Sequence, residues 1–363
     1  MKIGVIAHLK HPIKAPFAGG LEAFTYEITH RLTQRGHEVT LFASSSSAAG
    51  GKLYPILDDC SYDSRTGMRL KKSDLSSEYI AEHHAYYRMM TEIDAFELDV
   101  IFNNSLHYVP VTMAGVIKTP MATVLHTPPF YELQLATRAE QRFKNISYMT
   151  VSRSNAENWK EYISDCPFIH NGIDLNKWTF YPEGKQGNYA IWFGRIHPDK
   201  GLDTAIQAAK LAGMPLKVAG GIADKKYYSE KIEPLLDSNT QMLGLLDHQQ
   251  LNRLIGEARV CLITPVWQEP FGLVVAESMA CGTPVAGVRT GALPEIVTDE
   301  GGILVEPGDA PGLAGAMLQA IALDRKKIRN YAEANLNIEE MLTRYEKFLE
   351  SVVTQHLALT SKL

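Results

Sequence analysis

The stretch TPVWQEPFGLVVAESMACGTPV (264–285) holds two glutamates on either side of an expected helix start. Gly272 is placed to open that helix, and the first residues of a helix leave their backbone N–H groups without partners. The N–H groups of Gly272, Leu273 and Val274, together with the positive end of the helix, would suit a diphosphate. We count the neighbouring Phe271 with this ligand-binding group.

The two glutamates are expected at the two ends of such a ligand. Glu277 lies three and four residues after Val274 and Leu273, so the three share one face of the helix. A carboxylate there would suit the paired hydroxyls of a ribose. Glu269 precedes the helix and could reach a sugar on the other side of the phosphates. Each acid alone could instead cap the helix or lie in solvent, but together with Gly272 they favour a binding site.

Two acids beside a diphosphate require cations, and the stretch WFGRIHPDKGLD (192–203) supplies them. Arg195 is expected at the carboxyl end of a strand and Lys200 at the start of the next helix, so both can reach one crevice. Arg offers a planar fork to phosphate oxygens, and Lys a mobile point charge. Both would hold a leaving diphosphate as negative charge develops on it. The alternative is a surface Lys200 and an Arg195 in an ordinary salt bridge.

The N-terminal half offers weaker candidates. In AGGLEAF (18–24), Gly19 and Gly20 would let the backbone approach a ligand closely, although a simple tight turn explains them equally well. In VLHTPPF (124–130), His126 follows an expected strand and would face a ligand at the carboxyl edge of the sheet. A structural histidine whose ring is satisfied by hydrogen bonds to the backbone is an equal alternative.

Three further features rank lower. Glu22 lies next to the glycine loop. The Asn171–Gly172 pair is a strong turn former, so we predict a turn there, on the hinge side of a linker. Glu295 follows Pro294 at an expected helix start, a position that favours an acid on its own account.

The elements that must position these residues alternate along the chain. The first unit is a strand at 2–8, a helix at 21–36 and a strand at 37–43. Nearly continuous apolar strands suit parallel sheets covered on both faces. The pattern predicts an α/β protein with two Rossmann-like, doubly wound parallel sheets. Further strands are expected at 99–104, 120–126, 146–152, 189–196, 215–221, 241–246, 259–265, 283–288 and 301–307, and further helices at 201–213, 249–258 and 272–282.

A polar, Gly-rich stretch at 174–188 divides the two alternations. A cleft between two such domains is a natural ligand site. Residues 44–52 read as a loop and 53–95 as a solvent-exposed variable insert. We predict an N-terminal domain over 1–165, a linker over 166–188, a C-terminal domain over 189–337, and a terminal helix over 338–363 that packs back on the N-terminal domain.

Composition and charge narrow the class of protein. With 363 residues, 45% hydrophobic and 21% charged, the chain can bury two cores. A formal net charge of −5 argues against a nucleic-acid partner. The cysteines form no CxxC pair, so neither a metal site nor a disulfide framework is expected; they are Cys60, Cys166, Cys261 and Cys281.

The sequence also bears on location. The first residues, MKIGVIAH, read as a strand and not as a signal peptide, and no apolar run is long enough to cross a membrane. A cytoplasmic location is therefore expected. Peripheral contact with a membrane stays open, because a basic face could meet anionic lipid or an acidic acceptor, although a solvated face is the simpler reading. Its residues are Lys10, His11, Lys14, Arg31 and Arg35.

Taken together, the motifs resemble the retaining glycosyltransferases of family four, whose two-domain architecture is called GT-B. The resemblance covers almost the whole chain and is weakest at 53–95. Two glutamates separated by seven residues are its most specific mark. It rests on AGGLE near the start, IHNGID (169–174), FGRIHPDKG (193–201) and EPFGLVVAESMACGTPV (269–285).

The resemblance implies transfer of a hexose from a nucleotide-diphosphate sugar, UDP- or GDP-linked, with retention and without a metal or a further cofactor. The N-terminal domain would take the acceptor and the C-terminal domain the donor, facing a central cleft. The acceptor stays open between a sugar, a lipid-linked sugar and a small molecule. Retention would come from same-face attack assisted by the leaving phosphate, which needs no side-chain nucleophile.

Roles carry over residue by residue to the matching positions. Glu269 would contact the hydroxyls of the donor sugar, Glu277 the ribose, and Arg195 with Lys200 the diphosphate. Gly19 and Gly20 would approach the diphosphate from the other domain. His126 matches a cleft histidine of the family and is counted as catalytic with Glu269, Arg195 and Lys200. The donor-binding group is Gly19, Gly20, Phe271, Gly272, Leu273, Val274 and Glu277.

Two features of the sequence depart from the family's pattern, and two other functions stay open as alternatives. NLNIEEM (335–341) lacks the Trp of an aromatic-rich run that the family often has, and Gly291-Ala292 stands where a glycine pair is common. A nucleotide-sugar epimerase on the same fold would need no acceptor, and a non-catalytic binding module would consume no donor. A nicotinamide dehydrogenase is disfavoured because neither half has a GxGxxG fingerprint.

Overall fold

The structure of the chain, a computed structural model, describes residues 1–363 except 18, 59–76, 141–144, 183–186 and 362–363. It forms two compact units. Unit 1 comprises residues 1–151, 156–169 and 342–363, and unit 2 comprises residues 152–155 and 170–341. The domain limits given above stay predictions.

Unit 1 is built on a six-stranded parallel sheet in the order β3-β2-β1-β4-β5-β6. This is the order of a Rossmann-like doubly wound sheet, in which the direction of winding reverses between the first and fourth strands. Every residue of β4 and β5 is buried, as expected for strands covered on both faces. The strands are β1 (Lys2–Ile6), β2 (Glu38–Ser44), β3 (Lys52–Leu57), β4 (Val100–Asn103), β5 (Met121–Leu125) and β6 (Ile146–Thr150).

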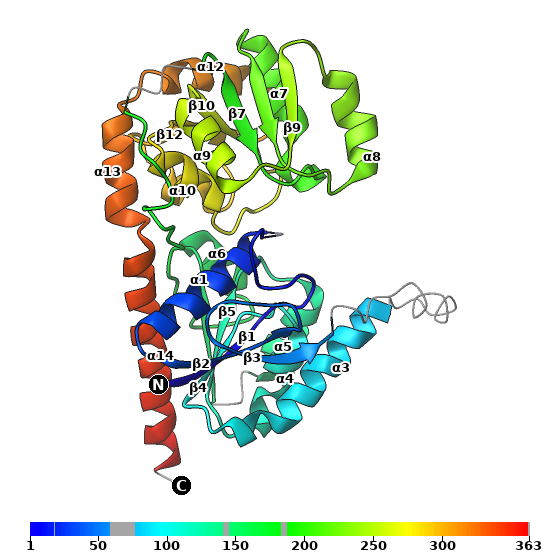
Figure 1. The fold of residues 1–363 in the computed structure, drawn as a ribbon, viewed down its shortest axis with the longest axis vertical. Helices are drawn as coiled ribbons and strands as arrows, with labels where there is room; N and C mark the ends of the chain where they lie inside the picture. Colours follow the sequence, from blue (N-terminus) through cyan, green and yellow to red (C-terminus); the bar gives the residue numbers. More distant parts are fainter. Residues whose placement is uncertain (18, 59–76, 141–144, 183–186, 362–363) are drawn as a thin grey trace. The chain divides into compact units, whose positions relative to one another are not determined.

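Helices cover this sheet, and α3, α4 and α5 lie side by side along unit 1 (Figure 1). The C-terminal helix α14 belongs to the same unit from residue 342 onward. There Tyr345 is fully buried, with its ring 5.7 Å from that of Phe24 and 5.4 Å from that of Phe102. The helices are α1 (Gly20–Gln34), α3 (Ser77–Glu92), α4 (Tyr108–Met113), α5 (Tyr131–Glu140), α6 (Arg153–Trp159) and α14 (Ile338–Thr360), with 3-10 turns at Ile93–Phe96 and Ala114–Val116.

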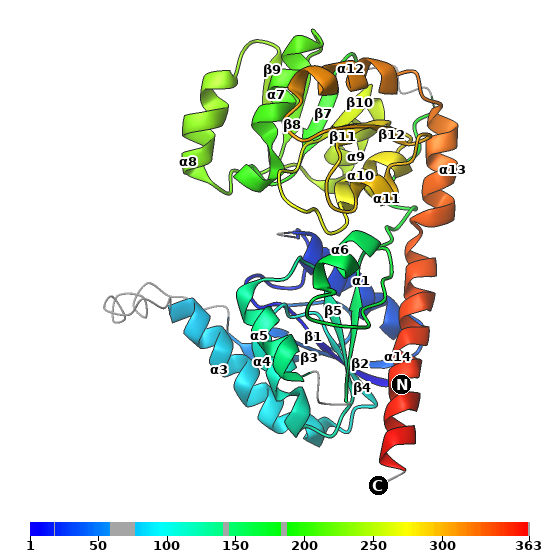
Figure 2. The same ribbon diagram turned by 180° about the vertical axis from the view of Figure 1, so that it is seen from behind.

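Unit 2 repeats the same strand order in a second six-stranded parallel sheet, β9-β8-β7-β10-β11-β12 (Figure 2). The two central strands of this sheet, β7 and β10, consist of buried residues only. The strands are β7 (Ala190–Phe193), β8 (Leu216–Ala219), β9 (Thr240–Gly244), β10 (Val260–Ile263), β11 (Val285–Val288) and β12 (Gly302–Val305). The α/β class with two Rossmann-like doubly wound sheets is thus confirmed.

The helices of unit 2 pack on both faces of that sheet, and its core joins side chains of α7 and α12 to the strands. The helices are α7 (Leu202–Leu211), α8 (Lys225–Tyr227), α9 (His248–Glu257), α10 (Leu273–Ala280), α11 (Leu293–Ile296), α12 (Ala310–Ala320) and α13 (Arg325–Asn335). Shorter turns lie at Pro198–Lys200, Tyr228–Ile232 and Glu233–Leu235.

The prediction of a solvent-exposed insert at 53–95 is wrong for the residues of that range that the structure describes. Residues 52–57 form β3, which pairs with β2, and α3 buries Tyr86, Met89 and Met90 in the core of unit 1. The prediction failed because α3 mixes these apolar residues with Glu, Arg and His at many positions, which hides the helical period. Residues 59–76, including Cys60, lie outside the described part of the chain.

The turn predicted at Asn171–Gly172 is also not formed. Instead Ile173 makes a parallel bridge with Asn337, and Ile173 N–H and C=O bond to Leu336 and Ile338. A Cβ on Gly172 would lie 2.6 Å from Ile338 Cα. The glycine is therefore required by close approach of the backbone and not by a turn.

No helix in the described ranges is both long enough and apolar enough to cross a membrane.

Candidate functional site

The loops after β7 and β10 carry most of the predicted site residues. β7 and β10 are neighbours in the sheet of unit 2, and the winding direction reverses between them. In doubly wound sheets, ligands bind at the carboxyl ends of the strands at this reversal. Arg195 and Lys200 follow β7, whereas Glu269, Phe271 and Gly272 follow β10.

Three hydrogen bonds lock these two loops together. Thr264 Oγ1 donates to the Lys200 carbonyl at 3.0 Å and accepts from Trp192 Nε1 at 3.1 Å. Val266 N–H donates to the Asp199 carbonyl at 2.9 Å. Gly201 has a φ of +61°, and a Cβ there would lie 2.1 Å from the Thr264 carbonyl oxygen. The glycine thus permits the approach that fixes the backbone of Lys200 against the β10 loop.

The side chains of Lys200 and Glu269 form an ion pair. Lys200 Nζ lies 2.6 Å from Glu269 Oε2, and the side chains are 25% and 13% exposed. Trp267 Nε1 donates to the same oxygen at 3.0 Å, and its ring centroid is 5.3 Å from Lys200 Nζ. The indole therefore orients the acid and lies against the cation. Trp267 was not singled out from the sequence, although it stands two residues before Glu269.

The backbone of Glu269 is held by the segment after β11. Ala292 N–H donates to the Glu269 carbonyl at 2.8 Å, and Thr290 Oγ1 donates to the Trp267 carbonyl at 3.1 Å. A Cβ on Gly291 would lie 2.2 Å from the backbone carbonyl oxygen of Glu269, so only glycine fits there. The contact of residue 292 is made by its backbone, which explains why alanine serves at that position.

The helix α10 begins as the sequence predicts. Gly272 is its N-cap with a φ of +87°, and the first turn contains Leu273 and Val274. Their N–H groups precede the first helical hydrogen bond, which Val275 N–H donates to the Gly272 carbonyl. Phe271 is buried and anchors the loop. The N-terminus of α10 thus offers amides to an anion beside the Lys200–Glu269 pair.

Glu277 lies one turn further along α10. Burial raises the pKa of its carboxyl to about 7. Within the described part of the chain, no side chain makes a hydrogen bond or ion pair with this carboxylate. A half-buried acid without a partner is costly in a structural role, so this geometry suits an acid that awaits ligand hydroxyls.

Arg195 is exposed in the loop after β7 and makes no hydrogen bond or ion pair with the described residues. The structure therefore brings Lys200 and Glu269 together but does not bring Arg195 into contact with either. An arginine side chain on the surface of this loop can reorient toward a ligand.

In unit 1, the glycine loop stands at the start of α1. Gly19 is the N-cap in an extended conformation, and Gly20 is the first helical residue. A Cβ on Gly19 would lie 3.1 Å from Glu22 Oε2. Glu22 is buried and faces His8 Nδ1 at 3.5 Å. Burial alone would raise the pKa of Glu22, but the neighbouring His8, the backbone and His11 outweigh burial and lower that pKa.

His126 follows β5, as predicted. Its Nε2 lies 2.8 Å from Asn104 Oδ1, so the ring donates to the amide oxygen. The ring also meets Phe24 edge-on at 4.7 Å. Burial, and to a smaller extent His8, lower the pKa of His126 to about 3. His126 is thus a neutral hydrogen-bonding group at neutral pH.

Glu295 does more than favour the start of its own short helix α11. Its carboxylate accepts from the N–H groups of Arg153 at 2.9 Å and Ser154 at 2.5 Å, and lies 3.1 Å from His170 Nε2. Arg153 and Ser154 begin α6, so Glu295 caps that helix across 142 and 141 positions of sequence. No sequence signal pointed to this contact.

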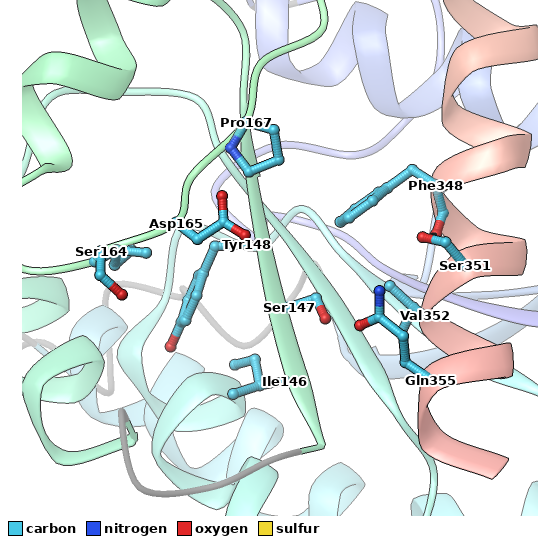
Figure 3. Close-up of a pocket in the computed structure, with 11 residues that line it drawn as sticks. Ile146, Ser147, Tyr148, Ser164, Asp165, Pro167, Phe348, Ser351, Val352 and Gln355 are labelled. Carbon is cyan, nitrogen blue, oxygen red and sulfur yellow. Dashed lines mark hydrogen bonds between the residues drawn. The ribbon is translucent and has the colours of Figure 1, made fainter. Parts of the chain in front are cut away.

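A pocket of about 350 Å³ lies elsewhere in unit 1, between the edge strand β6 and α14 (Figure 3). It is lined by the first residues of β6, among them Ser147, and by Phe348 and Gln355 of α14. The beginning of a strand is the end opposite to the carboxyl edge where doubly wound sheets take ligands. The pocket contains none of the predicted site residues, and we assign it no role in the site.

Within the described residues, no three His, Cys, Asp or Glu side chains are grouped so that they could hold a metal ion. Cys166, Cys261 and Cys281 are free thiols. Cys281 is fully buried, and burial raises its pKa to about 12, so it serves as a small residue of the core.

Two curated relatives resemble the chain in sequence. The D-inositol 3-phosphate glycosyltransferase of Mycolicibacterium smegmatis is 24% identical over 417 residues, which cover 98% of this chain and 93% of that protein. An uncharacterized glycosyltransferase of Methanocaldococcus jannaschii is 33% identical over 156 residues, which are 42% of this chain and 43% of that protein.

Solved structures resemble the fold. Sucrose-phosphate synthase from Thermosynechococcus elongatus superimposes with a TM-score of 0.79 at 18% identity, covering 98% of this chain and 100% of that one. HepE of Anabaena, solved in complex with UDP-glucose, gives a TM-score of 0.74 at 19% identity over 97% of this chain and 100% of that one. Both are glycosyltransferase neighbours of the GT-B type.

Two family models match the chain in succession. The one described as Glycosyltransferase Family 4 matches residues 18–177, and the one described as Glycosyl transferases group 1 matches residues 179–335. They divide the chain near the start of unit 2 and together include every predicted site residue. With its two Rossmann-like sheets and these two matches, the chain belongs to the glycosyltransferases of family four and has the GT-B fold.

Proposed function

We propose that the chain transfers a sugar from a nucleoside-diphosphate sugar, UDP- or GDP-linked, to an acceptor hydroxyl, with retention at the anomeric carbon and without a metal ion. The observation that carries this proposal is the Lys200–Glu269 pair beside the N-terminus of α10, at the winding reversal of the unit 2 sheet. It joins a cation, free amides and an acid where a diphosphate sugar needs each of them.

The diphosphate would lie at the N-terminus of α10. The N–H groups of Leu273 and Val274 would bind its oxygens, and the Lys200 ammonium would neutralise the charge that develops on the leaving group. Arg195 would add its fork from the neighbouring loop. These positive groups supply the charge that a divalent cation supplies in other transferases, which supports metal independence.

The two acids would hold the two sugars of the donor. Glu277, with its raised pKa, would accept hydrogen bonds from the ribose hydroxyls. Glu269 would accept from hydroxyls of the transferred sugar. Its Oε2 is already held by Lys200 and Trp267, which leaves the other oxygen to the ligand and makes it a poor nucleophile.

The proposed reaction balances without a protein nucleophile. The bond between the anomeric carbon and the phosphate oxygen breaks as the acceptor oxygen attacks the same face. The acceptor proton passes to that phosphate oxygen, and a nucleoside diphosphate leaves. The roles that the family resemblance implies for His126, Gly19 and Gly20 stay predictions.

Three measurements test the proposal. UDP and GDP are screened for a rise in melting temperature with EDTA present, because a ligand of the folded state stabilises it. A panel of UDP- and GDP-hexoses is then incubated with sugar acceptors, and proton NMR of the product reports the anomeric configuration. We expect one nucleotide to bind, transfer to survive EDTA, and the product to keep the donor's configuration.

The proposal has a matched control in α7. Lys200→Ala should abolish the melting shift, whereas Lys210→Ala should not, because Lys210 lies at the other end of the helix in an ion pair with Asp237. Inverted product, or activity that disappears with EDTA and returns with Mg²⁺, would overturn the corresponding part of the proposal. Donor converted without an acceptor to an epimer would replace it with epimerisation.

A further inference from the structure

Unit 1 contains a cluster of histidine and tyrosine side chains that the site described above does not use. It is centred on His107, at the start of α4, directly after β4. The ring of His107 packs against those of Tyr86 and Tyr108, with centroids 4.5 Å and 4.8 Å away. His83 of α3 is 6.2 Å away and bonds through Nδ1 with the Tyr108 hydroxyl at 2.6 Å.

The loop from Asn103 to His107 holds this ring rigidly. Asn103 Oδ1 accepts from the N–H and the hydroxyl of Ser105, and Ser105 Oγ accepts from His107 N–H. Leu106 has a φ of +52°, a conformation that costs free energy for a residue with a side chain. A strained conformation of this kind persists only where the surrounding structure holds it in place. Here the conformation of Leu106 sets the position of the next residue, His107.

The tautomer of His107 follows from its contacts. Its Nδ1 accepts from Val109 N–H at 3.2 Å, so in the neutral ring the proton is on Nε2. Burial, then His83 and His8, lower the pKa of His107 to about 3, so the ring is neutral. Nε2–H is therefore a fixed donor. It is buried and has no hydrogen-bond acceptor within the described residues.

A second donor on the same loop is also without an acceptor. Asn104 is completely buried, and its Oδ1 accepts from His126, which leaves Nδ2 as a donor. Nδ2 has no partner among the residues that the structure describes. An unpaired buried donor costs about 1–3 kcal/mol, so two on one loop indicate that a ligand completes them.

The place of these donors in the fold also indicates a ligand. β4 is the neighbour of β1 where the winding of the unit 1 sheet reverses, the position at which doubly wound sheets take ligands. His8, which follows β1, is close enough to influence the titration of both His107 and His126. Polar residues that follow β1, β4 and β5 thus lie close together within unit 1.

The charges around the donors favour a neutral ligand. His107 and His126 are neutral donors, and the Glu22 carboxylate stands beside His8. The donor loop, Asn103–His107, contains no Lys or Arg that would bind a phosphate or a carboxylate. A ring bearing several hydroxyls offers acceptors to both donors and apolar C–H faces to the flanking aromatic rings.

We propose that the loop Asn103–His107 is the acceptor-binding element of this transferase, and that His107 Nε2–H and Asn104 Nδ2–H donate to hydroxyls of a neutral polyhydroxylated ring, a sugar or a cyclitol. This inference rests on the proposed function for the identity of the ligand as acceptor. The contact itself can be tested without turnover.

The first test is histidine side-chain ¹H–¹⁵N NMR of the full chain, titrated with glucose, mannose and myo-inositol. The Nε2 resonance of His107 is identified by its loss in His107→Asn. We expect at least one neutral ring compound to shift it. A resonance unmoved by all three would indicate that water completes the donors and would overturn the proposal. A shift caused only by inorganic phosphate or by phosphorylated sugars would overturn its neutral ligand.

The second test separates the donor role from a structural role. His107→Asn keeps an acceptor for Val109 N–H, because asparagine is a good N-cap, but removes the Nε2 donor. His107→Gln keeps a donor near Nε2 but loses the cap. We expect His107→Asn to raise the acceptor KM about three- to tenfold and His107→Gln, which keeps a donor, to leave it near the wild-type value. Both variants should lower the melting temperature, because both remove a buried ring. His84→Phe, at an exposed position of α3, is the control.

The outcomes also distinguish this inference from the proposed function. Nucleotide binding and transfer with an unchanged acceptor KM in His107→Asn would overturn the inference alone. Absence of any transfer would overturn the proposed function, and the NMR titration would still decide whether the loop binds a hydroxylated ring.

Discussion

Lys200 Nζ and Glu269 Oε2 lie 2.6 Å apart on the loops that follow two neighbouring strands, and Trp267 donates to the same oxygen. The pair is partly buried and is held from both sides by backbone contacts through Gly201 and Gly291. In the proposed donor complex, Lys200 would therefore be shared between the diphosphate and Glu269. The two residues act as one unit, so their substitutions should not be additive.

Substitution of the pair is the first prediction. We expect Lys200→Ala to lower kcat/KM about 100- to 1,000-fold, because removal of one preorganised donor to a developing charge costs about 2.7–4 kcal/mol. Glu269→Gln should lower it as well while retaining affinity for the nucleoside diphosphate alone. Steady-state kinetics and calorimetry of the single and double variants measure this. A double variant whose loss equals the product of the single losses would contradict a shared unit.

The pKa of Glu277 predicts a pH dependence of nucleotide binding. Burial raises the pKa of its carboxyl from 4.5, the value of a free glutamate, to about 7 in the folded protein. The ribose hydroxyls would donate to the charged form, so nucleotide affinity should rise as pH increases through about 7, with release of a proton. Calorimetry in two buffers of different ionisation enthalpy detects that proton. Glu277→Gln should bind weakly at every pH, and a wild-type affinity that is flat from pH 6 to 8 would contradict the role.

The raised pKa of Glu277 also predicts that the free energy of unfolding falls as pH rises, whereas nucleotide affinity rises. Because the folded-state pKa is raised, the folded protein holds more protons than the unfolded chain between about 4.5 and 7, and Glu277 lowers stability as pH rises through that window. Glu277→Gln should therefore flatten this part of the stability curve and gain stability at pH 8 relative to the wild type. Urea unfolding at pH 5 and pH 8 measures the difference.

Two glycines with nearly equal backbone angles test the contact that fixes Lys200. Gly201 (φ +61°) would place a Cβ 2.1 Å from a carbonyl oxygen, whereas Gly213 (φ +62°) has nothing within 4 Å. Gly213→Ala should cost about 1–2 kcal/mol, from the left-handed conformation alone. Gly201→Ala should cost about 3 kcal/mol or more and should also reduce activity. Equal losses in urea unfolding would show that the contact with the β10 loop is unimportant.

For two tyrosines of unit 1 we expect opposite changes in stability when the hydroxyl is removed. The hydroxyl of Tyr345 is buried without a partner in the described structure, so Tyr345→Phe should leave stability unchanged or raise it by about 1 kcal/mol. The hydroxyl of Tyr86 donates to the Ala7 carbonyl at 2.7 Å, so Tyr86→Phe should cost about 1 kcal/mol. Thermal unfolding compares them, and a clear loss in Tyr345→Phe would indicate an ordered water on its hydroxyl.

Much of the fold could be predicted from the sequence, since buried parallel strands are short apolar runs that need no other information. Where the pattern was mixed, prediction failed. The segment at 77–92 forms a helix whose apolar face is interrupted by Glu82 and flanked by histidines, so its period is hidden until neighbouring elements are placed. Asn171–Gly172 has the composition of a turn, but Gly172 is there because the start of α14 leaves no room for a Cβ.

The candidate site was predictable in its residue types and less so in its contacts. Helix-start chemistry pointed to Gly272, and residue spacing to Glu277, because both are local. The Lys200–Glu269 pair joins residues 69 positions apart, and the capping of α6 by Glu295 joins residues more than 140 apart. Such contacts depend on strand order, which local patterns do not specify. The histidines of HHAYY (83–87) and LHYV (106–109) were a visible signal, but only the sheet brings them together.

Unit 1 takes its residues from both ends of the sequence, and this has a consequence for synthesis. Its sheet is complete once residue 150 has been made, yet Tyr345, Leu349 and Val352 of α14 are buried in the protein and belong to the same unit. On the ribosome, the nascent sheet must therefore wait until unit 2 has been synthesised before Phe24 and Phe102 gain their aromatic neighbour. The segment that completes unit 1 is thus translated only after the whole of unit 2.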